Sequence, residues 1–148
     1  MHRLAVDNDI PALVTLKYKM FEEIDMAHLL VDDFISEVTE DYRKLYSLGM
    51  AQHFVIEHDG RITACAGAFI KDDIPYRYFK ERQYGFIGDV YVHPEFRKRG
   101  YARTLTNAAL HWFAERDVKT IRLLASQNAR PLYASLGFIG TDEMVLHR

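Results

Sequence analysis

One stretch of the sequence restricts the fold more than any other, because it predicts a strand, a helix and a second strand in direct succession. Residues 84–92, YGFIGDVYV, form an apolar run of strand length, and residues 100–116 carry apolar side chains at helical spacing. Residues 119–125, KTIRLLA, return to a strand pattern. Two strands joined through a helix almost always lie parallel with a right-handed crossover. The chain therefore predicts a sheet that contains a parallel pair.

A tight hairpin upstream adds antiparallel pairing to this sheet. Residues 52–70 place two strand patterns on either side of Asp59-Gly60, a dipeptide that accepts the positive φ of a tight turn. The remaining patterns predict strands over residues 2–5 and 143–148, and helices over residues 9–23, 32–48 and 129–137. The expected fold class is α/β (α+β), a single domain over residues 1–148 with a central mixed, twisted sheet and helices on both faces.

The composition excludes several other classes of protein. The chain has 148 residues, 49% apolar and 27% charged, which is ordinary for one soluble globular domain. No apolar run approaches the roughly 20 residues that a membrane span needs, and the N-terminus lacks the pattern of a secretion signal. The one cysteine, Cys65, cannot form an internal disulfide. We therefore expect a cytoplasmic protein with no membrane partner.

Positive charge gathers at the junction between the strand at 84–92 and the helix that follows it. Residues 93–122 hold seven basic and three acidic side chains, whereas residues 1–50 hold ten acidic and five basic ones. A helix N-terminus offers unpaired N–H groups and about half a positive charge, which together favour an anion. Gly100 and Ala102 keep this junction open to close approach. The sequence therefore predicts a phosphate site here.

Other ligands fit the junction less well. It lacks the GK[ST] of a P-loop, and its glycine spacing differs from that of a dinucleotide fingerprint. The net charge is −2 and no second basic stripe exists, which argues against nucleic acid as a partner. The seven histidines show no metal-ligand spacing, so we expect no metal.

Two motifs around the junction resemble those of a known family. Residues 90–110 resemble the acetyl-coenzyme A motif of the GNAT acetyltransferase superfamily, V-x-P-x-x-R-x-x-G-x-G/A, and the matching residues are Val92, Pro94, Arg97, Gly100 and Ala102. Residues 126–138 resemble the family's second motif, and the matching residues are Tyr133, Leu136, Gly137 and Phe138. The motifs occur in the family's order, and the similarity covers about residues 84–138.

The resemblance implies an N-acetyltransferase that uses acetyl-CoA as its acetyl donor. A bulge near residues 90–92 would splay the central strand from its parallel neighbour and free its backbone to bond the pantetheine arm. The pyrophosphate would sit on the N–H groups of residues 98–103. Ser126 stands seven residues before the motif tyrosine, where relatives often carry an asparagine. The implied cofactor-binding residues are Val90, Tyr91, Val92, Arg97, Lys98, Arg99, Gly100, Tyr101, Ala102, Arg103 and Ser126.

The resemblance also implies catalytic groups for acyl transfer to an amine. Tyr133 matches the acid that protonates the departing thiolate, and the Val92 N–H matches the oxyanion donor. Relatives often carry a glutamate base on the central strand, but here Phe86 stands near that place and Asp89 is the strand's only carboxylate. Asp89 as base, Glu143 as a weaker candidate and a water chain without a dedicated base all stay open.

No motif selects the acceptor. The family spans small amines, antibiotics, amino acids, polyamines and protein amino groups, and the acidic first third of this chain, including Asp32 and Asp33, favours a cation. The expected reaction is direct attack by a primary amine of a small molecule or peptide in a ternary complex. Tyr76, Tyr78 and Phe79 are candidates for acceptor or subunit contact, and a homodimer stays open. The alternative function is a non-catalytic module that binds or senses acyl-CoA on the same fold.

Overall fold

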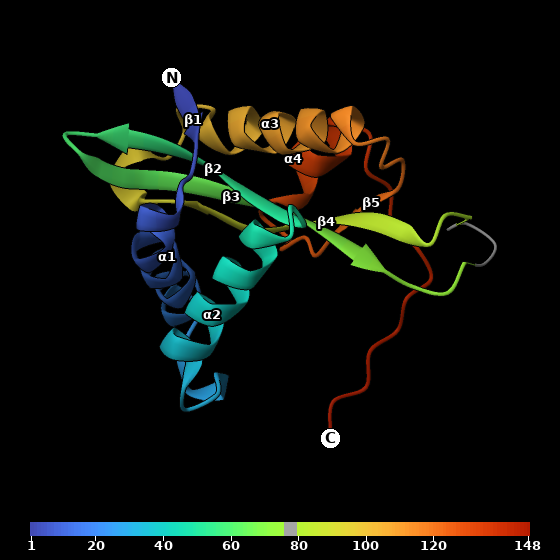
Figure 1. Cartoon of the computed structure of the whole chain (residues 1–148), viewed down its shortest axis with the longest axis horizontal. Helices are drawn as coiled ribbons and strands as arrows, with labels where there is room; N and C mark the ends of the chain where they lie inside the picture. The colour runs from blue at the N-terminus through green and yellow to red at the C-terminus, as the bar shows by residue number, and fades with distance from the viewer. Residues whose placement is uncertain (76–79) are drawn as a thin grey trace.

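The computed structural model describes residues 1–75 and 80–148 and shows one mixed sheet with helices on both faces (Figure 1). Its five strands lie in the order β1-β2-β3-β4-β5. They are β1 (His2–Leu4), β2 (Ala51–His58), β3 (Arg61–Asp72), β4 (Gln83–Val92) and β5 (Ile121–Leu123). The helices are α1 (Ile10–Glu23), α2 (Phe34–Ser47), α3 (Tyr101–Glu115) and α4 (Arg130–Ser135).

The sheet combines the two kinds of pairing that the sequence predicts. Strands β1 to β4 pair antiparallel, and β4 pairs parallel with β5 across the α3 crossover. Figure 1 shows α3 on one face of the sheet and α1 with α2 on the other. The expected fold class is thereby confirmed, and the helices and first five strands lie within a few residues of their predicted bounds.

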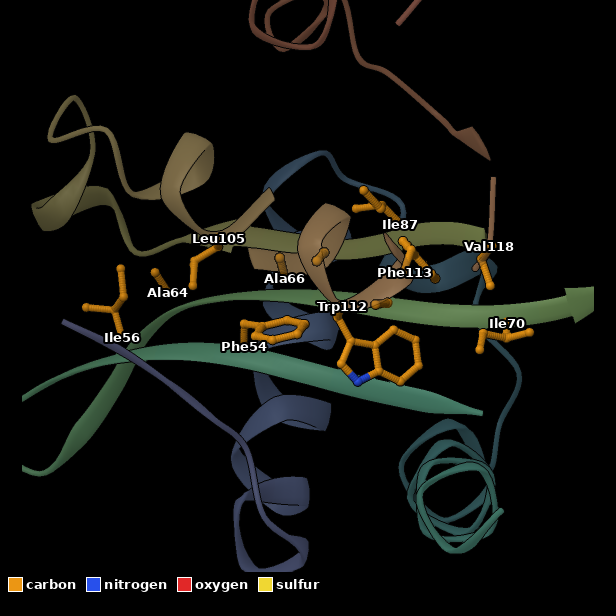
Figure 2. Close-up of a cluster of buried hydrophobic side chains, with 12 residues drawn as sticks. Phe54, Ile56, Ala64, Ala66, Ile70, Ile87, Leu105, Trp112, Phe113 and Val118 are labelled. Atoms are coloured by element: carbon orange, nitrogen blue, oxygen red, sulfur yellow. The ribbon is translucent and has the colours of Figure 1, made fainter. Parts of the chain in front are cut away.

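Two apolar clusters fill the space between the sheet and its helices. The cluster under α3 contains Phe54, Leu105, Trp112 and Phe113 (Figure 2). The ring of Phe113 approaches β4 so closely that a Cβ at Gly85 would stand 2.8 Å from it. This contact packs the last turn of α3 against the first half of β4.

The other cluster lies under α1 and α2. It includes Ile10, Leu13, Val55 and Tyr91. Because Ile87 belongs to the first cluster and Tyr91 to the second, β4 changes the face that it presents to α3 somewhere between these residues. That change locates an irregularity in the strand.

One expectation from the sequence is wrong, and another falls on residues that the structure does not describe. The strand predicted over residues 143–148 is wrong: these residues follow α4 outside the sheet, and Met144, Val145 and Leu146 are exposed. A strand needs a partner edge, and β5 ends at Leu123 after three residues. The aromatic loop residues at 76, 78 and 79 lie outside the described residues. Among the described helices, none is both long and apolar enough to cross a bilayer.

Candidate functional site at the open edge of β4

The parallel pair opens halfway along β4. Gly85 to Ile87 pair with Ile121 to Leu123, after which β5 ends while β4 continues to Val92. Leu124, the next residue after β5, is 79% exposed. The second half of β4 therefore has β3 on one side and an edge free of β5 on the other.

A β-bulge separates the two halves of β4. Gly67 faces Gly88 and Cys65 faces Tyr91, so the single residue between them on β3 stands opposite both Asp89 and Val90. Asp89 takes a left-handed conformation with φ of 55°, which aspartate tolerates better than most residues. The bulge thus begins one residue before the region in which the sequence places it.

The bulge decides which backbone groups face the open edge. The His93 N–H bonds the Thr63 carbonyl of β3 at 2.8 Å. Because backbone groups alternate in direction along a strand, Val92 and Val90 turn their N–H and C=O groups away from β3, and Tyr91 turns its own toward it. The Val92 carbonyl accordingly accepts a hydrogen bond at 2.8 Å from Arg97 Nε rather than from β3.

The turn between β4 and α3 has the backbone of an anion site. Lys98 and Gly100 both adopt left-handed conformations, with φ of 62° and 79°. Helical bonding begins with the Thr104 N–H, which bonds the Gly100 carbonyl at 3.0 Å, so the N–H groups before it belong to the helix N-terminus. Successive N–H groups in such turns form concave nests for anions. A Cβ on Gly100 would meet nothing within 4 Å, so its φ rather than crowding within the chain calls for glycine.

The cations of this region divide between several partners. Arg97 turns back onto Val92 and onto Glu23 of α1. Arg99 lies 5.0 Å from the Phe96 ring centroid, and Arg103 Nη2 donates to Ser135 Oγ of α4 at 2.8 Å. The sequence predicts that these arginines all attract the phosphates of the ligand. In the structure the Arg97 side chain instead bonds Val92 and Glu23, so it differs from the other two.

The second motif brings Tyr133 and Ser126 to the α4 side of the site. Tyr133 is 6% exposed and its ring packs edge-on against Phe138 with centroids 5.9 Å apart. Burial raises the pKa of Tyr133, so its phenol stays protonated at neutral pH. Ser126 Oγ accepts the Ala129 N–H at 3.3 Å, which leaves its own hydroxyl hydrogen to donate.

Asp89 joins a buried polar cluster rather than the open edge. Its Oδ1 accepts from Lys17 of α1 at 2.5 Å, and its Oδ2 contacts Tyr42 of α2 and His53 of β2, the latter at 2.8 Å. Only 3% of the Asp89 side chain is exposed. We call these four residues, Lys17, Tyr42, His53 and Asp89, the Asp89 hub. It ties four elements together beneath the bulge.

The hub keeps Asp89 ionised. Burial alone would raise the pKa of Asp89, but the hydrogen bond and electrostatic interaction with His53 and the positive charge of Lys17 outweigh it and hold that pKa well below its usual range. Burial and the Asp89 charge together raise the pKa of Tyr42 far above its usual value. Tyr42 is therefore a fixed donor and Asp89 a fixed acceptor, and neither exchanges protons near neutral pH.

A smaller cluster joins the end of α1 to the end of β4. Tyr91 Oη donates to Glu23 Oε1 at 2.7 Å, and Arg97 Nη2 donates to Glu23 Oε2 at 2.7 Å. We call Glu23, Tyr91 and Arg97 the Glu23 clasp. Burial and the hydrogen bond to Glu23 raise the pKa of Tyr91 to about 12. Sequence analysis missed Lys17, Tyr42 and His53 and counted Glu23 only among the acidic residues of the first third, because no local pattern links residues so far apart in the chain.

A pocket of about 540 Å³ lies along the segment that joins α1 to α2. Aromatic and acidic side chains line it together, including Tyr18, Asp32, Asp33 and Phe34. The Tyr91–Glu23 hydrogen bond places the start of this segment beside the second half of β4. A second pocket, of about 530 Å³, is lined by residues such as Asn8, Gln52 and Trp112, none of which belongs to the clasp. Among the described residues, no group of His, Cys, Asp or Glu could hold a metal ion.

Comparison with known proteins agrees with this arrangement. The sequence model described as the acetyltransferase (GNAT) family matches residues 21–138, which include the bulge, the turn and both motifs. A search of curated proteins gives no match.

Solved structures share the fold over the full chain. A predicted acetyltransferase from Clostridium acetobutylicum with acetyl-CoA has a TM-score of 0.89 at 25% identity, covering 100% of this chain and 95% of its own. A GCN5-related N-acetyltransferase from Ralstonia eutropha has a TM-score of 0.82 at 25% identity, covering 100% and 97%. An aminoglycoside N-acetyltransferase in complex with CoA has a TM-score of 0.78 at 18% identity, covering 100% and 93%, and shows the fold alone.

Proposed function

The chain belongs to the acetyltransferase (GNAT) family, and on this premise we propose that it transfers an acetyl group from acetyl-CoA to a primary amine. The amine belongs to a small molecule or a peptide and attacks the thioester directly while both substrates are bound. The observation that carries the proposal is the open edge of β4, which leads from the bulge at Asp89 into the left-handed turn before α3. Along the chain, the surface therefore offers the free backbone groups of β4 to an extended ligand and then the N-terminus of α3 to an anion.

These two parts of the surface suit the two halves of coenzyme A. The amide-rich pantetheine arm would lie along Val90 and Val92 as an added strand does, since their backbone groups face away from β3. The diphosphate would lie on the N–H groups of residues 98–103 at the start of α3. We expect the backbone of Tyr91, Gly100, Tyr101 and Ala102 to shape this surface and the Ser126 hydroxyl to approach the cofactor from the α4 side. Basic side chains add charge attraction, namely Lys98, Arg99 and Arg103.

The proposed chemistry forms one bond and breaks one. The amine nitrogen attacks the acetyl carbon, and the oxygen of the tetrahedral intermediate takes a hydrogen bond from the Val92 N–H. As the C–S bond breaks, the Tyr133 phenol gives its proton to the sulfur. In the described part of the chain no side-chain hydrogen bond involves the Tyr133 hydroxyl, which supports this role because the donor is uncommitted.

The amine's own proton leaves to water in this proposal. Asp89 is the only carboxylate of β4, but its three partners and its lowered pKa make it a weak base at neutral pH. Glu143 lies exposed in the segment after α4. A water chain without a dedicated base is therefore the option that the contacts favour.

We assign the acceptor to the pocket between α1 and α2. Its aspartates, Asp32 and Asp33, favour a cation, and the rings of Tyr18 and Phe34, with centroids 6.2 Å apart, favour an apolar body. Neighbouring structures of the same fold include aminoglycoside N-acetyltransferases, which are also named for amine acceptors. A cationic amine with a hydrophobic part is the substrate class that this pocket suits.

The experiment is a screen of such amines by thiol release, followed by the Tyr133→Phe variant on the best acceptor. We expect kcat to fall about 100-fold or more, the usual range for loss of a general acid, while acetyl-CoA affinity measured by calorimetry stays within about 3-fold. Tyr46→Phe is the matched control, because it also removes one phenol hydroxyl, here from a half-buried side chain whose hydroxyl bonds His53 Nδ1 at 2.8 Å, away from the open edge. A variant Tyr133→Phe with wild-type kcat would remove Tyr133 from the mechanism, and a wild-type protein that binds no acetyl-CoA would overturn the proposed function.

A further inference from the structure

Arg97 belongs to the family's phosphate-binding motif, yet its side chain is committed elsewhere. Its Nε donates to the Val92 carbonyl at 2.8 Å and its Nη2 to Glu23 Oε2 at 2.7 Å. Its guanidinium carbon also lies 5.8 Å from the centroid of the Tyr91 ring. The planar fork of arginine thus bonds a backbone group and a carboxylate at once, which a lysine cannot do.

Glu23 occupies a place that its own helix disfavours. It is the last residue of α1, where the helix dipole repels a negative charge. Burial acts against its charge too, but the hydrogen bonds from Tyr91 and Arg97 hold the pKa of Glu23 below its usual range. A carboxylate at this position is therefore stabilised by its contacts with Tyr91 and Arg97 and not by the dipole of α1.

Arg97 holds the residue whose N–H the proposed chemistry uses. It bonds the Val92 carbonyl at the end of β4, one peptide plane beyond that N–H, and so restrains the Val92 backbone from one side. A carbonyl has two lone pairs, so the bond from Arg97 fixes Val92 and still leaves one acceptor site for a ligand. The rate of a reaction falls steeply when the reacting groups are displaced by a fraction of an ångström.

We propose that Arg97 and Glu23 are positioning residues: they fix the Val92 backbone for the thioester end of the cofactor and do not bind its phosphates. The inference rests on the proposed function, because it assumes that acetyl-CoA is the ligand. It separates Arg97, which acts on the strand, from the other basic residues at 97–103, which attract the diphosphate. Tyr91 completes the clasp by holding the second oxygen of Glu23.

The test uses two ligands that share their phosphates but differ in the arm. Acetyl-CoA contains both halves, and 3′-phospho-ADP contains only the nucleotide half. Isothermal titration calorimetry on the full-length protein gives the Kd of each ligand for wild type, Arg97→Gln, Glu23→Gln and the double variant. Lys98→Gln is the matched control, since it removes one positive charge from the adjacent position.

Arg97→Gln is expected to weaken acetyl-CoA about 5-fold, the factor that corresponds to one lost hydrogen bond, and to leave 3′-phospho-ADP within 2-fold. Glu23→Gln should show the same pattern, and the double variant should be no weaker than Arg97→Gln alone. Lys98→Gln should weaken both ligands by a similar factor. With the best acceptor from the screen, Arg97→Gln should also lower kcat, which loss of a phosphate contact would not do.

Two results would overturn the inference while leaving the proposed function intact. If Arg97→Gln weakens both ligands equally, Arg97 acts on the phosphates; if it weakens neither, the clasp is only a surface ion pair. Wild type that binds neither ligand would instead reject the proposed function. Melting curves without ligand separate these results from unfolding: an exposed ion pair contributes little, so each variant should melt within about 4 °C of wild type.

Discussion

The Asp89 hub and the Glu23 clasp both tie helix α1 to the β4 region, but they lie in opposite environments. In the hub, Lys17 of α1 meets Asp89, and their side chains are 24% and 3% exposed. In the clasp, Glu23 of α1 meets Arg97, and their side chains are 38% and 46% exposed. Each cluster joins a carboxylate, a cation and a tyrosine hydroxyl. Burial is therefore the main physical difference between them.

This difference separates a stabilising role from a positioning role. A buried ion loses its hydration, so removing one of its partners leaves an uncompensated charge and is strongly destabilising. An exposed ion pair keeps much of its hydration and contributes little to stability. We therefore expect substitutions in the hub to unfold the protein more readily and substitutions in the clasp to change cofactor handling.

The largest effect is expected from Asp89→Ala. It leaves Lys17 and His53 without their shared acceptor, and the free energy of unfolding should fall by about 3–5 kcal/mol, as for other broken buried pairs. Urea unfolding at pH 7 measures it. Asp41→Ala on the exposed side of α2 is the control and should stay within about 0.5 kcal/mol of wild type. A loss as small as that of the control would mean that the hub does not support the fold.

A matched pair of tyrosines compares the clusters more sharply. Tyr42 donates to Asp89 and Tyr91 donates to Glu23, so Tyr42→Phe and Tyr91→Phe each remove one hydroxyl from one carboxylate. Hydrogen bonds to buried charges contribute about 1.5–3 kcal/mol, so Tyr42→Phe should cost about 2 kcal/mol. Tyr91→Phe should cost less than about 1 kcal/mol, because the Glu23 side chain is partly exposed. Equal losses in urea unfolding would show that burial does not decide the contribution.

The sequence predicts the elements of this site better than its contacts. The strand, the turn at Gly100 and the helix after it follow from local patterns, because each depends on residues adjacent in the chain, whereas the bulge is expected only from the resemblance to the family. The hub and the clasp join residues that are 36 to 74 positions apart, and only the folded sheet brings them together. Asp89 could be singled out as an acid in an apolar strand, but its partners could not.

The same distinction explains the strand that does not form. Residues 143–148 have the apolar side chains of a strand, but β5 ends at Leu123 and those residues lie outside the sheet. Strand propensity is local, whereas pairing depends on an edge supplied by another part of the chain. The sequence-based assignment of Arg97 to phosphate has a similar origin. The motif predicts where the Arg97 backbone lies, but the direction of its side chain depends on Glu23, which is distant in the chain.

The smallest expected effect is a difference in acid sensitivity. Both Asp89 and Glu23 have a pKa lowered on folding, so each stabilises the protein above about pH 4, the unfolded value, and loses that contribution as the pH falls through its folded pKa. Asp89→Asn removes the titrating group, so the free energy of unfolding should fall less steeply than in wild type between about pH 4 and pH 2, by up to about 1.4 kcal/mol per pH unit. Glu23→Gln should change this slope much less, because the side chains of Glu23 and Arg97 are both partly exposed and water screens the shift in the pKa of Glu23. Urea unfolding at several pH values gives both slopes. A larger change of slope in Glu23→Gln than in Asp89→Asn would reverse the assignment of stability to the hub and positioning to the clasp.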